Sequence, residues 1–218
     1  MNTDMMIIDD ILIDKINVIG IMGKIGSGKS TLSNYLVAEK NFKEFSFADP
    51  LKKGLIEIFG MDEKDFYGSQ EDKLKINEYW NTNARELCQK VGTNIFRDNI
   101  NVFLPNLKSN ENFWVKRTHL DILKHIEKEN SNISSNKNNK INIVFSDIRF
   151  ENELNYVKNI LKGNIYYIER SNNINNTKDI NIHKSETNYK YLIDKYNVIT
   201  LENNSSINNL YSNFNFNL

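Results

Sequence analysis

Short apolar runs alternate along this chain with longer segments in which apolar residues recur every three or four positions. The runs are rich in β-branched and aromatic residues, which is typical of buried strands. They predict strands within residues 16–23, 42–49, 141–147, 164–170 and 196–203. Strands that alternate with helices pair in parallel and are covered on both faces, so the pattern predicts an α/β fold.

Helical spacing of apolar residues occupies much of the chain between these strands. It predicts helices from residue 30 and within residues 49–60, 82–92, 92–107, 112–129 and 150–163. In the second helix, we expect Asp49 as the N-cap, Pro50 at the first helical position and Gly60 at the end. The buried stripe expected on that helix consists of Leu51, Leu55, Ile58 and Phe59.

The helix expected over residues 82–92 begins with Thr82 as its cap and stops at Gly92. Its buried face would contain Ala84, Leu87, Cys88 and Val91. Arg85 and Gln89 are one turn apart, so they would share a different face of the helix.

The chain has 218 residues, which favours a single domain over residues 1–218. Two polar and aperiodic segments, residues 130–140 and 171–183, are expected to be loops. The 28 basic and 28 acidic residues cancel. A dominant electrostatic partner such as duplex DNA would need a surplus of Lys and Arg, so we expect no nucleic-acid partner.

Cys88 is the single cysteine, which excludes an internal disulfide and fits a reducing compartment. The apolar N-terminal segment is interrupted by charged residues, namely Asp9, Asp10, Asp14 and Lys15. No uninterrupted run approaches the ~20 residues that span a bilayer, so we expect neither a targeting segment nor a membrane partner. These features predict a cytoplasmic protein.

Residues 23–30, Gly-Lys-Ile-Gly-Ser-Gly-Lys-Ser, match the pattern G-x-x-x-x-G-K-[ST]. The glycines let backbone N–H groups converge on an anion at a helix N-terminus, where the helix dipole favours negative charge. Lys29 would reach the β- and γ-phosphates, and the Ser30 hydroxyl would ligate Mg²⁺. The match follows a predicted strand and opens a predicted helix, which is the context that the motif requires. The sequence therefore predicts phosphate binding.

This motif alone does not separate kinases, ATPase motors, GTPases and binding modules. The 218-residue length disfavours the large motors, and the chain contains no guanine-reading N-K-x-D tetrapeptide. A small-molecule kinase and a nucleotide-binding module remain.

Asp147 ends the apolar run of residues 141–147. A strand there would deliver its carboxylate beside the phosphate loop, where it could hold Mg²⁺ together with Ser30. Alternatively, Asp147 could cap the following helix. Arg149 could reach a substrate phosphate, or it could pair with Glu151 or Glu153.

Several other segments carry a family resemblance. They are "FADPLKKGL", "ARELCQKVGT" followed by "FRD", "FWVKR", "SDIRFENE" and "HKSE", in this order after "GKIGSGKST". With these segments the chain resembles the deoxynucleoside monophosphate kinases of bacteriophages and large DNA viruses. The resemblance implies a three-layer P-loop NTPase fold with a parallel sheet flanked by helices, and with acceptor-binding and lid excursions. It also implies ATP as phosphoryl donor, Mg²⁺ as cofactor and a deoxynucleoside monophosphate as acceptor.

The resemblance assigns regions and residues to these roles. The phosphate-loop strand and helix would span residues 16–44, the acceptor-binding region residues 45–117 and the lid residues 171–183. Because water would compete for the γ-phosphate, we also expect residues 45–97 and 171–182 to close over the substrates. The ATP phosphates would contact Gly23, Lys24, Gly26, Ser27, Gly28, Lys29, Ser30, Thr31 and Arg170. The acceptor would contact Asp49, Lys52, Arg85, Gln89, Gly92, Thr93, Arg97, Trp114, Arg149, His183 and Glu186. Catalytic charge neutralisation would come from Lys29, Arg85, Arg97 and Arg149, and the metal would bind Ser30 and Asp147.

Simpler interpretations stay open beside these roles. Arg85 and Gln89 could form a solvated helix face, Trp114 could be packing, and His183 could be a helix cap. Tyr67 could touch a base. A dephospho-CoA kinase-like enzyme and a non-catalytic nucleotide-binding module are the alternative functions, and relatives of the viral family suggest a homodimer in the cytoplasm of the host.

Overall fold

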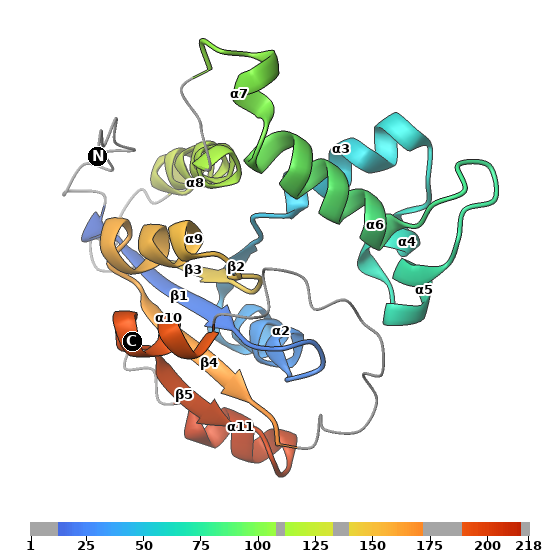
Figure 1. Cartoon of the computed structure of the whole chain (residues 1–218). Coiled ribbons are helices and arrows are strands. Elements are labelled where there is room, and N and C mark those ends of the chain that lie inside the picture. Colours follow the sequence, from blue (N-terminus) through green and yellow to red (C-terminus); the bar gives the residue numbers. More distant parts are fainter. Residues whose placement is uncertain (1–12, 108–111, 133–139, 172–188, 215–218) are drawn as a thin grey trace. The chain divides into compact units, whose positions relative to one another are not determined.

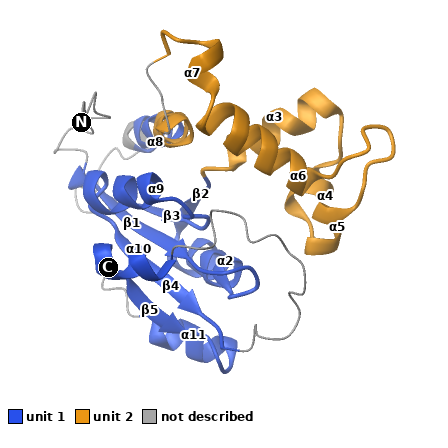
Figure 2. Ribbon diagram, in the orientation of Figure 1, with its two compact units in different colours: residues 1–46, 121–218 blue, residues 47–120 orange. Residues whose placement is uncertain are grey.

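The computed structural model describes residues 13–107, 112–132, 140–171 and 189–214. The chain forms two compact units (Figure 2). Unit 1 contains residues 1–46 and 121–218, and unit 2 contains residues 47–120. Unit 2 nearly coincides with the region that the sequence predicts to bind the acceptor. Within the described residues, no helix combines the length and apolar character needed to cross a bilayer.

A five-stranded parallel sheet forms the centre of unit 1 (Figure 1). Its strand order is β2-β3-β1-β4-β5. The strands are β1 (Ile16–Met22), β2 (Phe42–Phe45), β3 (Ile141–Phe145), β4 (Asn164–Glu169) and β5 (Ile199–Glu202). All five lie within the runs that the sequence predicts as strands. The sheet is flanked by helices, so the three-layer P-loop NTPase fold is confirmed.

Helices α2 (Lys29–Lys40) and α11 (Ile207–Asn213) cover one face of this sheet. Side chains from alternate positions of β1, together with residues of the neighbouring strands, form the core beneath them. The cluster contains Ile19, Ile21, Leu32, Leu36, Phe42, Val144, Tyr166, Ile168, Leu201, Leu210 and Phe214, all at most 8% exposed. Successive side chains of a strand point to opposite faces of the sheet, so Ile19 and Ile21 of β1 lie on the same face.

The opposite face is covered by α9 (Glu151–Asn155), which continues into the π-helical segment η3 (Tyr156–Ile160), and by α10 (Tyr189–Tyr196). Gly20 of β1 faces η3, and a Cβ there would lie 2.4 Å from Cδ1 of Ile148 and 2.6 Å from Cδ1 of Ile165. Glycine thus lets the helical layer approach the central strand closely. Tyr189 of α10 stacks at a tilt on Tyr167 of β4, with ring centroids 5.5 Å apart.

Unit 2 is helical. It contains α3 (Asp49–Phe59), α4 (Glu63–Tyr67), α5 (Gln70–Leu74), α6 (Ala84–Gln89), the π-helical segment η1 (Lys90–Arg97), α7 (Ile100–Phe103) and the start of α8 (Phe113–Asn132). In α3, Leu51 and Leu55 are buried as expected. Ile58 was expected in the same stripe but is 74% exposed, because it lies on the outer side of the last turn.

Helix caps are where the sequence-based expectations fail most often. Gly60 ends α3 in the left-handed conformation, as expected. Ala48 is the N-cap instead of Asp49, whose carboxylate binds Lys53 and Tyr67. Asn83 caps α6 by accepting from the Glu86 N–H, so the expectation for the preceding threonine is wrong.

Gly92 does not stop the helix that begins at Ala84. The chain continues helically through η1, and Gly92 is buried inside that segment. A Cβ on Gly92 would lie 2.4 Å from Cδ2 of Leu51, so glycine permits close packing of η1 against α3. The loop expected over residues 130–140 is also partly wrong, because α8 extends to Asn132. Helices α4, α5, α10 and α11 are additions to the predicted set.

Candidate nucleotide-binding site

The phosphate loop lies between β1 and α2, at the carboxyl end of the central strand (Figure 1). All three of its glycines, Gly23, Gly26 and Gly28, have positive φ angles. Gly23 has φ 151°, and a Cβ there would meet the Ile168 carbonyl oxygen at 2.7 Å. Gly28 has φ 107° and is the N-cap of α2, with no side-chain capping bond. The first N–H groups of α2 are therefore left for an anion, as the motif predicts.

Lys29 is the first residue of α2, and its side chain folds back over the loop. Its ammonium group donates to the carbonyl oxygen of Gly23 at 2.7 Å and to that of Lys24 at 2.8 Å. These contacts hold a positive charge at the loop, where a phosphate oxygen could replace a carbonyl as the acceptor. Thr31 is half-buried in the first turn of the helix, and Ser30 is exposed beside it.

Ser27 shapes the loop from inside. Its N–H donates to the Lys24 carbonyl at 3.2 Å, and its carbonyl accepts from the side-chain amide of Asn203 at 2.8 Å. Its hydroxyl is buried and has no hydrogen-bond partner in the described part of the chain. A phosphate contact by Ser27, which the resemblance implies, stays a prediction.

Two residues beyond the motif also contact the loop. Tyr189 of α10 directs its hydroxyl to the Gly23 carbonyl at 3.4 Å. Arg170, just after β4, has its guanidinium 3.5 Å from the Gly26 carbonyl, which places this predicted ATP contact at the phosphate loop. Sequence reasoning missed Tyr189 and Asn203. Neither has a motif, and only the strand order brings them to the loop.

Asp147 lies two residues beyond β3, the strand that pairs with β1. The Ser46 hydroxyl donates to its Oδ2 at 2.6 Å. Its alternative role as a helix cap is excluded, because Phe150 is the N-cap of α9 and the Glu153 carboxylate accepts from the N–H groups of Arg149 and Phe150.

A serine hydroxyl and a carboxylate would supply Mg²⁺ with the oxygen ligands that it prefers. Parallel pairing of Gly20 with Phe145 brings the ends of β1 and β3 to one edge, so Ser30 and Asp147 both follow strands that end there. Among the described residues, no cluster of three or more His, Cys, Asp or Glu side chains could hold a metal by itself. The donor set therefore fits Mg²⁺ shared between protein and phosphate oxygens.

Arg149 is exposed, and neither of the ion pairs considered for it is present in the described residues. Glu151 binds Lys195 at 2.5 Å instead, and Glu153 caps α9. Among the described residues, the guanidinium thus has no acidic partner that would compete with a phosphate.

In unit 2, Asp49 and Tyr67 organise the first turn of α3. The Tyr67 hydroxyl donates to one oxygen of Asp49, and Lys53 binds the other at 2.7 Å. Partial burial raises the pKa of Asp49, but the bonds from Lys53 and Tyr67 outweigh it and hold the pKa below its ordinary value. Lys52 lies over the Tyr67 ring, 4.6 Å from its centroid. Lys52 therefore packs against the ring, and it also attracts the Asp49 carboxylate electrostatically.

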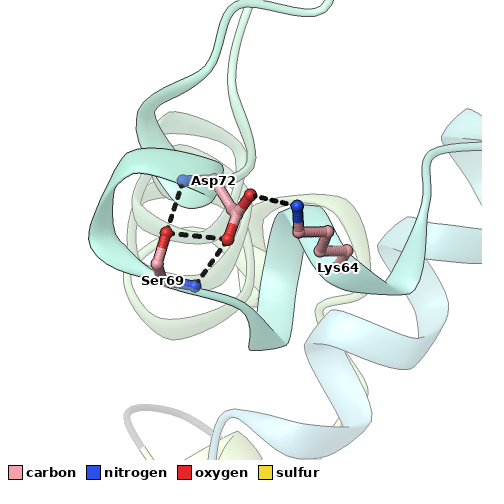
Figure 3. A network of polar contacts seen from close by, with 3 residues as sticks. All are labelled: Lys64, Ser69 and Asp72. Atoms are coloured by element: carbon pink, nitrogen blue, oxygen red, sulfur yellow. Dashed lines mark hydrogen bonds and ion pairs between the residues drawn. The ribbon is translucent and has the colours of Figure 1, made fainter.

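A polar network joins Lys64 of α4 to Ser69 and Asp72 at the start of α5 (Figure 3). Asp72 accepts from the N–H and hydroxyl of Ser69, and Lys64 binds its other oxygen at 3.0 Å. The side-chain bond from Ser69, followed by that from Lys64, lowers the pKa of Asp72 to about 2. The next residue after Ser69, Gln70, accepts from the Arg85 guanidinium.

Comparison with curated proteins identifies a relative in Acanthamoeba polyphaga mimivirus, named "Putative deoxynucleotide monophosphate kinase". The chain is 36% identical to it over 154 residues, which cover 70% of this chain and 74% of that protein. The chain belongs to the deoxynucleotide monophosphate kinase family. It is therefore a kinase, a P-loop phosphotransferase. No family model matches the chain.

Solved structures similar to the kinase include dephospho-CoA kinase from Campylobacter jejuni, with a TM-score of 0.46 and 15% identity over 91% of this chain and 93% of that one. TT1252 from Thermus thermophilus has a TM-score of 0.41 and 15% identity over 89% and 92%. The fold assignment rests on the parallel sheet and the phosphate loop.

Other residues expected at the acceptor differ in their surroundings. Arg85, Thr93 and Arg97 are half-buried on α6 and η1, whereas Gln89 is exposed. Trp114 of the kinase is 6% exposed, and its indole N–H donates to the Gly92 carbonyl at 2.8 Å. Such burial is typical of a packing residue. Contact of Trp114 with an acceptor stays a prediction. His183, Glu186 and lid residues 172–183 lie outside the described residues.

Proposed function

We propose that this kinase transfers the γ-phosphoryl group of ATP to the 5′-phosphate of a deoxynucleoside monophosphate, giving the diphosphate. The observation that carries the proposal is the phosphate loop of unit 1, with the Lys29 ammonium held over it. Membership of the deoxynucleotide monophosphate kinase family supports the choice of acceptor.

The acceptor phosphate is already anionic, so the reaction needs alignment and charge neutralisation more than a general base. Lys29 would exchange its two carbonyl contacts for oxygens of the β- and γ-phosphates. Mg²⁺, held by Ser30 and Asp147, would supply further neutralisation of the transferring group. In the proposed scheme, Arg149 stabilises charge on the same group.

On the acceptor side, Arg85, Arg97 and Lys52 are the proposed cations. Asp49, the neighbour of Lys52 on α3, already accepts from Tyr67 and Lys53. This supports a role for Lys52 in binding the acceptor. Asp49 and Tyr67 would then act as positioning residues for Lys52. Gln89, Thr93 and Trp114 would line the same region, and His183 and Glu186 are proposed to complete it.

The decisive experiment is ADP release in a coupled assay with dAMP, dGMP, dCMP, dTMP, their ribose counterparts and dephospho-CoA. We expect turnover with at least one deoxynucleoside monophosphate and none with dephospho-CoA. Turnover of dephospho-CoA alone would refute the proposed acceptor. Nucleotide binding without turnover of any acceptor would instead favour a binding module.

Two pairs of variants separate the donor and acceptor roles. Lys29→Ala should lower kcat by ~10²–10³ or more with the fold intact, because one cation at a transferring phosphate is worth a few kcal/mol. Its control is Lys40→Ala, which removes an exposed lysine from the last turn of the same helix. Arg85→Ala should raise the acceptor KM or lower kcat without weakening ATP binding. Its control is Lys90→Ala, where the lost contact is an exposed pair with Glu86.

A further inference from the structure

Asn203 bridges the end of β5 and the phosphate loop. Its backbone N–H donates to the Glu169 carbonyl at the end of β4, at 2.7 Å, and its side-chain amide donates to the Ser27 carbonyl at 2.8 Å. The backbone bond is independent of the side chain. It therefore sets the position of the Asn203 backbone, and the half-buried side chain reaches the loop from the end of β5.

The bond to the Ser27 carbonyl has a consequence for the next amide group. A trans peptide is planar, so the Ser27 carbonyl and the Gly28 N–H belong to one plane and point in opposite directions. Anchoring the carbonyl on Asn203 turns the Gly28 N–H away from Asn203. Gly28 is the N-cap of α2, where N–H groups bind phosphate oxygens.

Gly28 and Asn203 also fit each other sterically. A Cβ at Gly28 would lie 2.5 Å from the Asn203 side-chain nitrogen. The glycine of the motif thus serves the approach of Asn203 as well as the positive φ of 107°. Because Ser27 offers a carbonyl acceptor, the bridging side chain must present a donor. Aspartate, which has the same shape, would present only acceptors when ionised.

We propose that Asn203 is a positioning residue of the donor site, which directs the Gly28 N–H toward the polyphosphate by holding the Ser27 carbonyl. The proposal rests on the donor half of the proposed function and is independent of the acceptor. It separates Asn203 from its neighbour Asn204, whose side chain accepts from the Ser171 N–H instead.

The test measures binding of ATP and of inorganic tripolyphosphate to the full chain by calorimetry, together with the ¹H–¹⁵N resonance of the Gly28 amide. The variants are Asn203→Ala and Asn203→Asp. The control is Asn209→Ala, which removes an exposed side chain from α11 that binds Ser205. Because no acceptor is present, failure of the acceptor panel would leave this measurement unaffected.

We expect Asn203→Ala to weaken both ligands about tenfold, which corresponds to one hydrogen bond, and Asn203→Asp to weaken them more. The Gly28 resonance should shift in both variants and stay in place in the control. Affinities within twofold of the wild type would overturn the proposal, even with a lowered Tm, because Asn203 would then serve stability alone. An unchanged Gly28 resonance would overturn it as well. If Asn203→Asp fails to fold, the affinities and the Gly28 resonance of Asn203→Ala test the proposal.

Discussion

Replacement of Asp147 by asparagine tests whether its carboxylate serves the metal or only the fold. In the structure, Asp147 accepts a hydrogen bond of 2.6 Å from the Ser46 hydroxyl. The amide oxygen of an asparagine can accept the same bond, so Asp147→Asn removes the negative charge and keeps the contact. The variant therefore separates charge from local structure.

The expected magnitudes of the two effects differ widely. A hydrogen bond to a charged group contributes ~1.5–3 kcal/mol and a neutral one ~0.5–1.5, so the free energy of unfolding should fall by only about 1 kcal/mol. For a chain of this size, that corresponds to a Tm decrease of roughly 2–4 °C. Loss of a metal-binding charge should cost ~3–4 kcal/mol at the transition state, or a decrease in kcat of ~10²–10³.

The assay follows kcat against Mg²⁺ concentration, alongside thermal unfolding without nucleotide. Ser46→Ala is the control, because it removes the hydrogen bond and keeps the carboxylate charge. We expect it to lower Tm while most of kcat is retained. If Asp147→Asn kept more than about a third of kcat at every Mg²⁺ concentration, the carboxylate would have no role at the metal. Equal kcat losses in both variants would show that local structure, not charge, matters.

Three further predictions concern packing and pH. Gly20→Ala places a methyl group within 2.4 Å of a core isoleucine, so overpacking should lower the free energy of unfolding by ~1–3 kcal/mol, and an unchanged Tm would refute the close packing. Trp114→Phe removes the indole donor from the Gly92 carbonyl, and loss of this hydrogen bond should cost ~0.5–1.5 kcal/mol in denaturant unfolding; a stable variant with a raised acceptor KM would instead favour a binding role. Because the pKa of Asp72 is lowered to about 2 from 3.8, its ionised network with Ser69 stabilises the turn fully above about pH 4, and that contribution is lost as the pH falls through 2. An NMR titration of the Asp72 carboxyl group with a midpoint near 4 would contradict this.

The phosphate loop is the part of the site that follows from local sequence. The glycines at positions 23 and 28 allow the positive φ angles, and Lys29 supplies the charge, so both properties follow from the residue types themselves. The strands follow for the same reason, because runs such as residues 141–145 are apolar enough to be buried on both faces. Local chemistry thus predicted the parallel sheet and the position of the loop between β1 and α2.

Helix ends were predicted less well, because competing partners decide them. Asp49 has the chemistry of an N-cap, but Lys53 and Tyr67 bind its carboxylate once α4 folds beside α3. Gly92 has the chemistry of a helix stop, yet packing against Leu51 keeps it inside η1. In both cases a partner distant in sequence changes the outcome that the local signal favours.

The phosphate loop, its lysine and the strands that carry them could be predicted from the chain's residues alone, since backbone conformation and apolar burial are encoded in neighbouring residues. The bond from Asn203 to the Ser27 carbonyl and that from Ser46 to Asp147 become visible only in the folded chain. These pairs are separated by 176 and 101 residues, and they meet because parallel strands end at one edge of the sheet. No local sequence pattern marks residues such as Asn203 and Ser46, because their roles depend on where the preceding strands end in the folded chain.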